Sequence, residues 1–206
     1  MTPKNPQKPT RPLTLNRSDL FFYSGPLWRI HRVRAPHRMA WDGLREYGPL
    51  HQFRWEPHPV PVQDHPGVGV SYTATDYETA FAEVFQEPRA ITLTDHWVLS
   101  AWFPSRPLEL LDLTGKWALR HGASVSLHGA PKNTCRNWAQ GIHTTMGSRI
   151  DGLYVPSTLT GTPLVVLFSQ AASAFPTAPV LTRSLTNVAV ETLALKAAAS
   201  LSWPIR

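Results

Sequence analysis

The chain contains a single cysteine, Cys135, and no apolar run long enough to span a bilayer. One cysteine excludes an internal disulfide framework and is typical of a protein kept in a reducing cytoplasm. Of its 206 residues 42% are hydrophobic and only 17% are charged, which excludes a disordered chain and favours one globular domain. We therefore expect a cytoplasmic protein without a membrane anchor, with Cys135 as a plain buried thiol.

The common catalytic motifs are also missing. The sequence has no Gly-x-Gly-x-x-Gly fingerprint, no Walker loop and no Gly-x-Ser-x-Gly elbow. Its nine histidines lack the paired spacing of zinc ligands, so no metal site is expected. Any chemistry must come from residues that are dispersed along the chain.

Acidic residues are fewer than basic ones, 14 against 20, which gives a net charge of +6. Six basic residues crowd into positions 29–38: Arg29, His31, Arg32, Arg34, His37 and Arg38. Such a cluster suits a phosphate-bearing ligand, an acidic partner or nucleic acid. No nucleic-acid motif surrounds it, and a solvated basic face is the alternative.

Residues 1–19 form a basic, proline-rich segment without the hydrophobic stretch of a secretory signal. We expect a flexible leader there and a single domain over residues 20–206. Short strands alternate with few helices in that domain, which predicts an α+β fold. Strands are predicted at 28–33, after a turn at 20–23, and then at 50–55, 68–72, 90–94, 97–103, 108–113, 152–157, 162–168 and 188–193, with helices from about 76 and over 132–146.

The segment 68–85 is the most informative part of the chain. A β-branched strand ends at Tyr72, Thr75 or Asp76 can cap a helix, and the helix that follows carries Glu83 within an otherwise apolar turn. A carboxylate in such surroundings loses hydration unless a partner compensates it. The alternative is that Glu83 lies at the edge of the buried face.

A dispersed set of polar side chains fits the cleavage of an N-glycosidic bond in a dinucleotide. Arg29 and Arg54 are suited to hold a pyrophosphate, and Tyr72 can stack on a flat heterocycle. Glu83 can bind a ribose hydroxyl and stabilise an oxocarbenium-like centre, with Ser157 at another strand end.

Several segments of the chain resemble the RES-domain family in order, over roughly residues 25–170. The matching segments are Trp-Arg29-Ile, Phe-Arg54-Trp-Glu-Pro, Val-Ser-Tyr72-Thr-Ala-Thr, Glu-Thr-Ala-Phe-Ala-Glu83-Val-Phe, Asp112-Leu, Asp151-Gly-Leu-Tyr-Val-Pro-Ser157 and Pro-Leu-Val-Val-Leu-Phe. The tyrosine-to-glutamate block after an arginine-bearing segment is the most specific of them.

The resemblance implies the toxin of a bacterial toxin–antitoxin pair, with a mixed, bent sheet similar to that of ADP-ribosyltransferases. It implies degradation of NAD⁺ by phosphorolysis or hydrolysis, with NAD⁺ as substrate, inorganic phosphate as an optional co-substrate, and no metal or other cofactor. It also implies an Xre-like antitoxin that blocks the active site and provides the only link to nucleic acid; a homodimer is one option for the oligomeric state.

Carried onto this sequence, the resemblance makes Glu83, Arg29 and Tyr72 catalytic, and Arg29, Arg54, Tyr72 and a hydroxyl residue binding groups. That hydroxyl is Ser157 in the Val-Pro-Ser pattern, or Thr134 at the start of the preceding helix. The sequence departs from the family where His51-Gln52-Phe53 replace the usual glycines and Glu56 replaces Asn or Asp. An ADP-ribosyltransferase that modifies a macromolecule, and a catalytically weak nucleotide-binding module, are the alternative functions.

Overall fold

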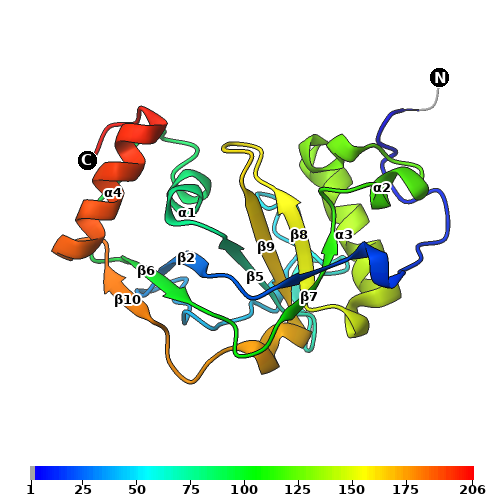
Figure 1. Cartoon of the computed structure of the whole chain (residues 1–206), viewed down its shortest axis with the longest axis horizontal. Helices are drawn as coiled ribbons and strands as arrows, with labels where there is room; N and C mark the ends of the chain where they lie inside the picture. Colours follow the sequence, from blue (N-terminus) through cyan, green and yellow to red (C-terminus); the bar gives the residue numbers. More distant parts are fainter. Residues whose placement is uncertain (1–2) are drawn as a thin grey trace.

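A computed structural model describes residues 3–206 and shows one α+β domain built around a large sheet (Figure 1). The strands are β1 Leu20–Tyr23, β2 Leu27–Arg32, β3 Tyr47–Gly48, β4 Gln63–Asp64, β5 Val70–Ala74, β6 Trp97–Trp102, β7 Leu108–Asp112, β8 Gly152–Pro156, β9 Pro163–Phe168 and β10 Leu181–Ser184. The α-helices are α1 Tyr77–Val84, α2 Trp117–Arg120, α3 Lys132–Met146 and α4 Val188–Leu201. Short 3-10 turns occur at Arg17–Asp19, Val125–Gly129, Gly147–Arg149 and Ser169–Ala174.

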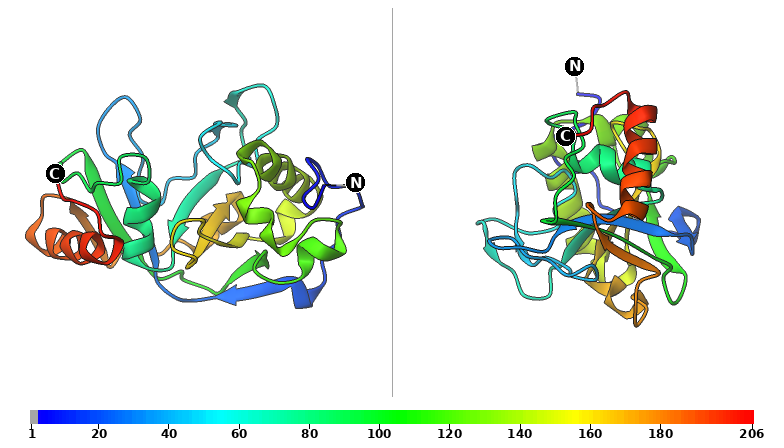
Figure 2. Two further views of the ribbon diagram at one scale, coloured as in Figure 1. Left: turned by 90° about the horizontal axis from the view of Figure 1, so that it is seen from above. Right: turned by 90° about the vertical axis from the view of Figure 1, so that its left-hand side faces the viewer.

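Eight strands form the large sheet in the order β1-β7-β8-β9-β5-β2-β6-β10, and β3 pairs only with β4. The β7–β8 pair is parallel, while the other neighbours in the large sheet are antiparallel. Figure 2 shows that the sheet is bent, with α1 and α4 near one end and α2 and α3 near the other. The prediction of a single α+β domain with a mixed, bent sheet is confirmed.

The core is divided between the two groups of helices and the opposite face of the sheet. Trp138 and Ile142 of α3 pack against β5, β8 and β9, and Phe81 of α1 packs with α4 against β2 and β6. A third cluster, which includes Leu27 and Trp102, covers the other face. The α1 and α3 groups therefore stand on the same face of the sheet and leave space between them for a site.

The predicted strand–turn–helix unit forms as β5 and α1. The Asp76 carboxylate caps the helix by accepting a hydrogen bond from the Thr79 backbone N–H at 2.7 Å. Phe81 and Phe85 of the predicted apolar face are buried, and Glu83 is half-buried. The strand runs two residues further than predicted, to Ala74.

Gly152 allows β8 to enter the sheet. It adopts φ 155°, and a Cβ atom there would lie 2.0 Å from the Val166 carbonyl oxygen of β9. Only glycine fits that approach, because any side chain would clash with backbone. The predicted strands at 97–103, 108–113, 152–157 and 162–168 are confirmed as β6, β7, β8 and β9, and the helix over 132–146 is confirmed as α3.

The prediction of a strand at 50–55 is wrong, because the segment forms a turn followed by irregular backbone. The Phe53 backbone N–H donates to the Leu50 carbonyl at 3.2 Å, which closes a turn. The side chain of Arg136 donates to the carbonyls of His51 and Phe53, at 2.8 and 3.1 Å. Both edges of the neighbouring β5 are already paired by β9 and β2, so the segment has no strand to join.

Three other local predictions need correction. Residues 188–193 belong to α4, because Asn187 caps the helix and Val190, Ala194 and Ala197 are buried at helical spacing. Residues 20–23 form the edge strand β1 rather than a turn. Residues 90–94 make only one bridge, between Ile91 and Ile205.

The segment before β1 is packed against α2 and α3, although a flexible leader was predicted for residues 1–19. The indole N–H of Trp138 donates to the Pro6 carbonyl at 2.9 Å, and that of Trp117 donates to the Thr14 carbonyl at 3.0 Å. The Thr14 backbone N–H donates to His121 at 3.1 Å. These bonds satisfy two buried indoles, so the described part of the leader is a structural strap; residues 1 and 2 lie outside the described residues.

Candidate active site

A narrow cleft is lined by residues of α1, the first turn of α3 and the middle of β5. The residues that line it come from a loop, two helices and three strands or strand ends: Gln52, Phe53, Arg54, Trp55, Tyr72, Glu83, Gln86, Lys132, Pro156, Thr158 and Leu164. Its free volume is about 60 Å³. Three predicted site residues, Arg54, Tyr72 and Glu83, thus meet at one place.

Glu83 and Ser157 form a direct pair at the cleft. The Ser157 hydroxyl donates to Glu83 Oε1 at 2.7 Å. Burial raises the pKa of the Glu83 carboxyl, while the hydrogen bond from Ser157 and the positive charges of Arg54 and Lys132 oppose that effect. The cleft therefore holds a partly desolvated carboxylate beside two cations.

The Ser157 hydroxyl is fixed by the turn that joins β8 to β9. Its oxygen accepts hydrogen bonds from the backbone N–H groups of Leu159 and Thr160, at 3.0 and 3.2 Å, and its proton points at Glu83. Thr134 is buried in the first turn of α3, and neither it nor Ser157 is among the lining residues. Of the two predicted hydroxyl residues, Ser157 is the one that contacts the glutamate.

Tyr72 is held by both its hydroxyl and its ring. The hydroxyl donates to Glu56 Oε1 at 3.0 Å, and the ring stacks on Phe53 with a centroid distance of 4.9 Å. Burial, together with the adjacent Glu56 carboxylate, raises the pKa of Tyr72 well above its ordinary value. The phenol therefore stays protonated and acts as a donor.

Glu56 anchors this part of the site, and sequence reasoning did not assign it a role. The fully buried carboxylate forms an ion pair with Arg45 and accepts hydrogen bonds from the Leu50 backbone N–H at 3.0 Å and from His58 at 3.2 Å. Burial alone would raise the pKa of Glu56, but the bonds from His58 and Arg45 hold it below its ordinary value. One sign of such a role was present in the sequence, because position 56 is a glutamate where the family usually has Asn or Asp.

Arg54 joins the cleft to the start of α3. Its guanidinium donates to the Ala130 carbonyl and its charge acts on Glu83. Lys132 also lines the cleft, from the first residue of α3, and was missed because an isolated lysine carries no motif. Cys135 is buried behind them, and burial raises the pKa of its thiol, in line with the plain buried thiol that was expected.

Arg29 lies away from the cleft. Its guanidinium donates from one nitrogen to the carbonyls of Ala40, Trp41 and Gly43, at 3.2, 3.0 and 2.8 Å. The side chain is 8% exposed, and burial lowers its pKa to about 10, which still leaves it charged at neutral pH. The structure therefore shows a support for the loop after β2 where the sequence predicted a phosphate ligand.

The basic cluster at 29–38 is not one continuous charged face. His31 is buried with Arg29, and burial lowers its pKa to about 4, so it is neutral. Arg32 stacks over the Trp97 ring at 4.7 Å, and Arg34 pairs with Asp95. Arg29 and His31 of the cluster are therefore buried, whereas Arg32 and Arg34 make their contacts at the surface.

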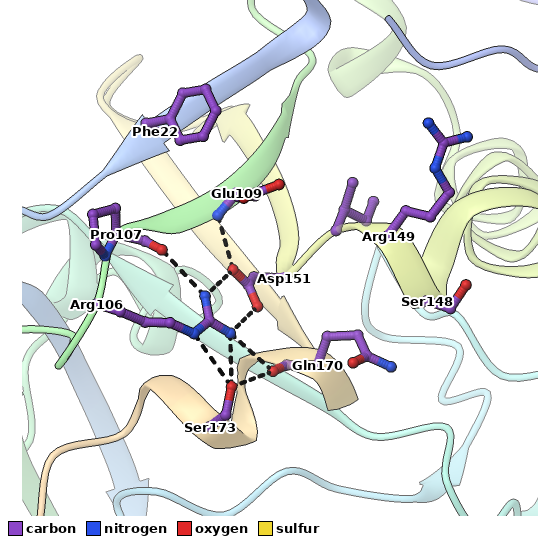
Figure 3. A pocket seen from close by; sticks show the side chains of 10 residues that line it. Phe22, Arg106, Pro107, Glu109, Ser148, Arg149, Asp151, Gln170 and Ser173 are labelled. Carbon is purple, nitrogen blue, oxygen red and sulfur yellow. Dashed lines mark hydrogen bonds and ion pairs between the residues drawn. The ribbon is translucent and has the colours of Figure 1, made fainter. Parts of the chain in front are cut away.

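A second hollow, of about 520 Å³, lies beside β1 and β7 (Figure 3). Arg106 there makes two hydrogen bonds of 2.7 Å to Asp151, whose carboxylate also accepts the Glu109 backbone N–H at 2.8 Å. Ser173 binds the same guanidinium at 2.7 Å. Because these groups satisfy one another, we place the candidate site in the smaller cleft.

Two properties of the described residues concern metals and membranes. Within residues 3–206 no three His, Cys, Asp or Glu side chains gather closely enough to hold a metal ion. In the same range no helix combines the length and apolar character needed for a bilayer span.

Comparisons with known proteins agree with the fold. A model of the RES domain family matches residues 26–190. Among solved structures, a chain of the M. tuberculosis MbcT-MbcA toxin-antitoxin complex is similar at a TM-score of 0.56 and 18% identity, over 84% of this chain and 91% of that one. No curated protein matches this chain significantly. At 18% identity the structural likeness shows a shared fold.

Proposed function

This chain belongs to the RES domain family, and from that premise we propose that it is the toxin of a toxin–antitoxin pair and breaks NAD⁺ at the nicotinamide–ribose bond. The observation that carries the proposal is that Glu83, which lines the cleft together with Arg54 and Lys132, accepts a hydrogen bond from the buried Ser157. A carboxylate beside two cations suits a substrate that develops positive charge on a ribose and carries phosphates nearby.

Glu83 stabilises the ribose as the bond breaks. The electron pair of the C–N bond leaves with the neutral nicotinamide, and positive charge builds up at the anomeric carbon. The Glu83 carboxylate lies beside that carbon and lowers the energy of the transition state. Ser157 keeps the carboxylate oriented and favours its ionised form through the 2.7 Å bond.

The acceptor completes the reaction at the same carbon. With water, the new C–O bond gives ADP-ribose and releases one proton. With inorganic phosphate, it gives an ADP-ribose phosphate. Both routes need no redox step, and the choice between a glycohydrolase and a phosphorylase follows from which acceptor the product contains.

Arg54 and Lys132 hold the pyrophosphate of NAD⁺. Both line the cleft and both are close enough to act electrostatically on Glu83. The Arg54 guanidinium can offer a planar pair of donors, whereas Lys132 is a point charge at the start of α3. Arg29 has no place in this mechanism, since its bonds go to the loop carbonyls at 40–43.

The direct test is to incubate the purified protein with NAD⁺ and to measure nicotinamide release with and without inorganic phosphate. Release that requires phosphate indicates phosphorolysis, and release without it indicates hydrolysis. Adenine-labelled NAD⁺ whose label remains on a macromolecule would favour an ADP-ribosyltransferase. No release at all would favour a nucleotide-binding module and would contradict the proposal.

In bacteria, expression of the chain alone should deplete NAD⁺ and arrest growth, and Glu83→Gln should relieve both effects. Growth arrest with an unchanged NAD⁺ pool would reject NAD⁺ breakdown. We further propose an Xre-like antitoxin as the partner, because the similar fold was seen in a toxin-antitoxin complex. Co-expression of such a protein from the neighbouring reading frame should restore growth, and failure to form a complex would contradict this.

A further inference from the structure

Phe53 covers one face of the Tyr72 ring. Their centroids are 4.9 Å apart and their planes differ by 18°, so the rings are in stacking contact. A flat ligand ring cannot enter between them at this separation. The aromatic surface of Tyr72, on which the sequence predicts that a flat heterocycle stacks, is thus occupied on this face by a side chain of the protein.

The covering ring belongs to a loop, whereas its partner belongs to the sheet. Tyr72 lies in β5 between two paired strands, and Phe53 lies in the turn after Leu50. Arg136 holds the backbone of that turn through the carbonyls of His51 and Phe53. The Phe53 side chain carries no hydrogen-bonding group and the bonds of this residue use its backbone, so the ring can rotate away without breaking a hydrogen bond.

Arg45 helps to keep the ring in place. Its guanidinium carbon lies 5.3 Å from the Phe53 centroid, and the same side chain forms the ion pair with Glu56 that positions the Tyr72 hydroxyl. The covering ring and the covered ring are therefore both held by one arginine. Cation–ring contacts at such partly exposed sites are weak, so the ring remains able to leave.

The size of the cleft also requires an opening step. About 60 Å³ is free, whereas pockets for ligands of moderate size occupy roughly 300–1,000 Å³. Glu83, Tyr72 and Leu164 line the cleft from α1, β5 and β9, which are packed into the core. The loop residues, Phe53 among them, are the part of the lining that can yield.

We propose that Phe53 is an internal occupant of the subsite in which a flat nitrogen heterocycle stacks on Tyr72, and that it must leave before the ring of the substrate enters. The identity of that heterocycle as nicotinamide rests on the proposed function. Such an occupant weakens apparent binding, because the apparent Kd is the intrinsic Kd divided by the fraction of molecules in which the subsite is open, and it leaves the reacting groups unchanged.

The test compares Phe53→Ala and Phe53→Gly with the parent protein, and Phe103→Ala serves as the control, since Phe103 is 52% exposed beyond the end of β6 and does not line the cleft. We expect the KM for NAD⁺ to fall about two- to tenfold in both Phe53 variants, the factor that one aromatic stacking contact represents. The kcat should not change, and the control should match the parent. Calorimetric titration with nicotinamide should show tighter binding by a similar factor.

An unchanged or higher KM in both Phe53 variants, with circular dichroism confirming the fold, would overturn the proposal and make Phe53 a neutral or substrate-binding residue. The failure of this inference can be distinguished from the failure of the proposed function. If nicotinamide binds more tightly to the Phe53 variants but no variant releases it from NAD⁺, the subsite inference holds and NAD⁺ breakdown fails. If neither nicotinamide nor NAD⁺ binds to any variant, both are overturned.

Discussion

Replacement of Glu83 by glutamine isolates the charge of the carboxylate from its shape. The amide oxygen of Gln can still accept the Ser157 hydroxyl bond that now measures 2.7 Å, so the turn after β8 should keep its geometry. What disappears is the negative charge that faces the developing positive charge. Loss of one preorganised electrostatic contact of this kind typically costs about 100- to 1,000-fold in rate, or roughly 2.7–4 kcal/mol.

The structure also fixes the expected effect of this substitution on stability. Because burial raises the pKa of Glu83 in the folded protein, the folded state binds the proton more tightly than the unfolded chain. Its contribution to stability is thus complete below the unfolded-state pKa and is lost as pH rises through the raised folded-state pKa. Above that raised pKa the ionised group does not favour folding, so there the glutamine variant should unfold at the same or a higher temperature.

The assay is the initial rate of nicotinamide release from NAD⁺, with thermal unfolding followed by circular dichroism. Glu87→Gln provides a matched control, since Glu87 is an exposed acid four residues further along that does not line the cleft. Turnover by the Glu83 variant at the parent rate would refute its catalytic role. Loss of activity together with a large loss of stability would refute the claim that only charge was removed.

Three further substitutions separate the roles of the other residues. Ser157→Ala removes a bond that favours ionised Glu83, so the acid limb of the rate–pH profile should move to higher pH; an unmoved limb would show that the bond does not tune the carboxylate. Arg54→Lys should raise the KM for NAD⁺ roughly tenfold, because the loss of one charge-assisted hydrogen bond changes affinity by about that factor. Steady-state kinetics that give the parent KM would show that Arg54 does not bind the pyrophosphate. Arg29→Met should lower the free energy of unfolding in urea by roughly 1–3 kcal/mol, because three partly buried carbonyls lose a charged donor, and should leave the KM unchanged; a raised KM at parent stability would return Arg29 to the binding site.

Local sequence patterns predicted those helices and strands whose intrinsic propensity agrees with the packing that surrounds them. The unit of β5 and α1 carries a capping Asp76 and an apolar face, and α3 carries Trp138, Ile142 and Met146 at helical spacing. Val188 to Leu193 reads as a strand because β-branched residues alternate there. It folds as a helix because an asparagine caps it and the alanines beyond pack against α1 and the sheet.

The sequence predicted the site residues that belong to a family motif and also have suitable chemistry. It did not predict the roles of residues whose partners come from segments far away in the sequence. Glu83, Tyr72 and Arg54 do meet at one cleft, and Ser157 contacts Glu83. The role of Arg29 depends on where the loop at 40–43 folds back, which no residue type near position 29 reveals. Glu56 gains its role from Arg45, His58 and Leu50, which converge only in three dimensions.

The strap before β1 and the end of α4 mean that the cooperative unit of this protein is larger than the stretch that defines its family. The family match covers residues 26–190, yet Trp138 takes its hydrogen-bond acceptor from Pro6, and Ala197 and Ala198 contribute to the core after the match ends. Ile91 likewise takes its acceptor from the Pro204 carbonyl. A polypeptide cut at the family boundaries would therefore lack acceptors and packing partners for its own interior. In this chain the segment that matches the family is shorter than the segment that must be present for the domain to fold.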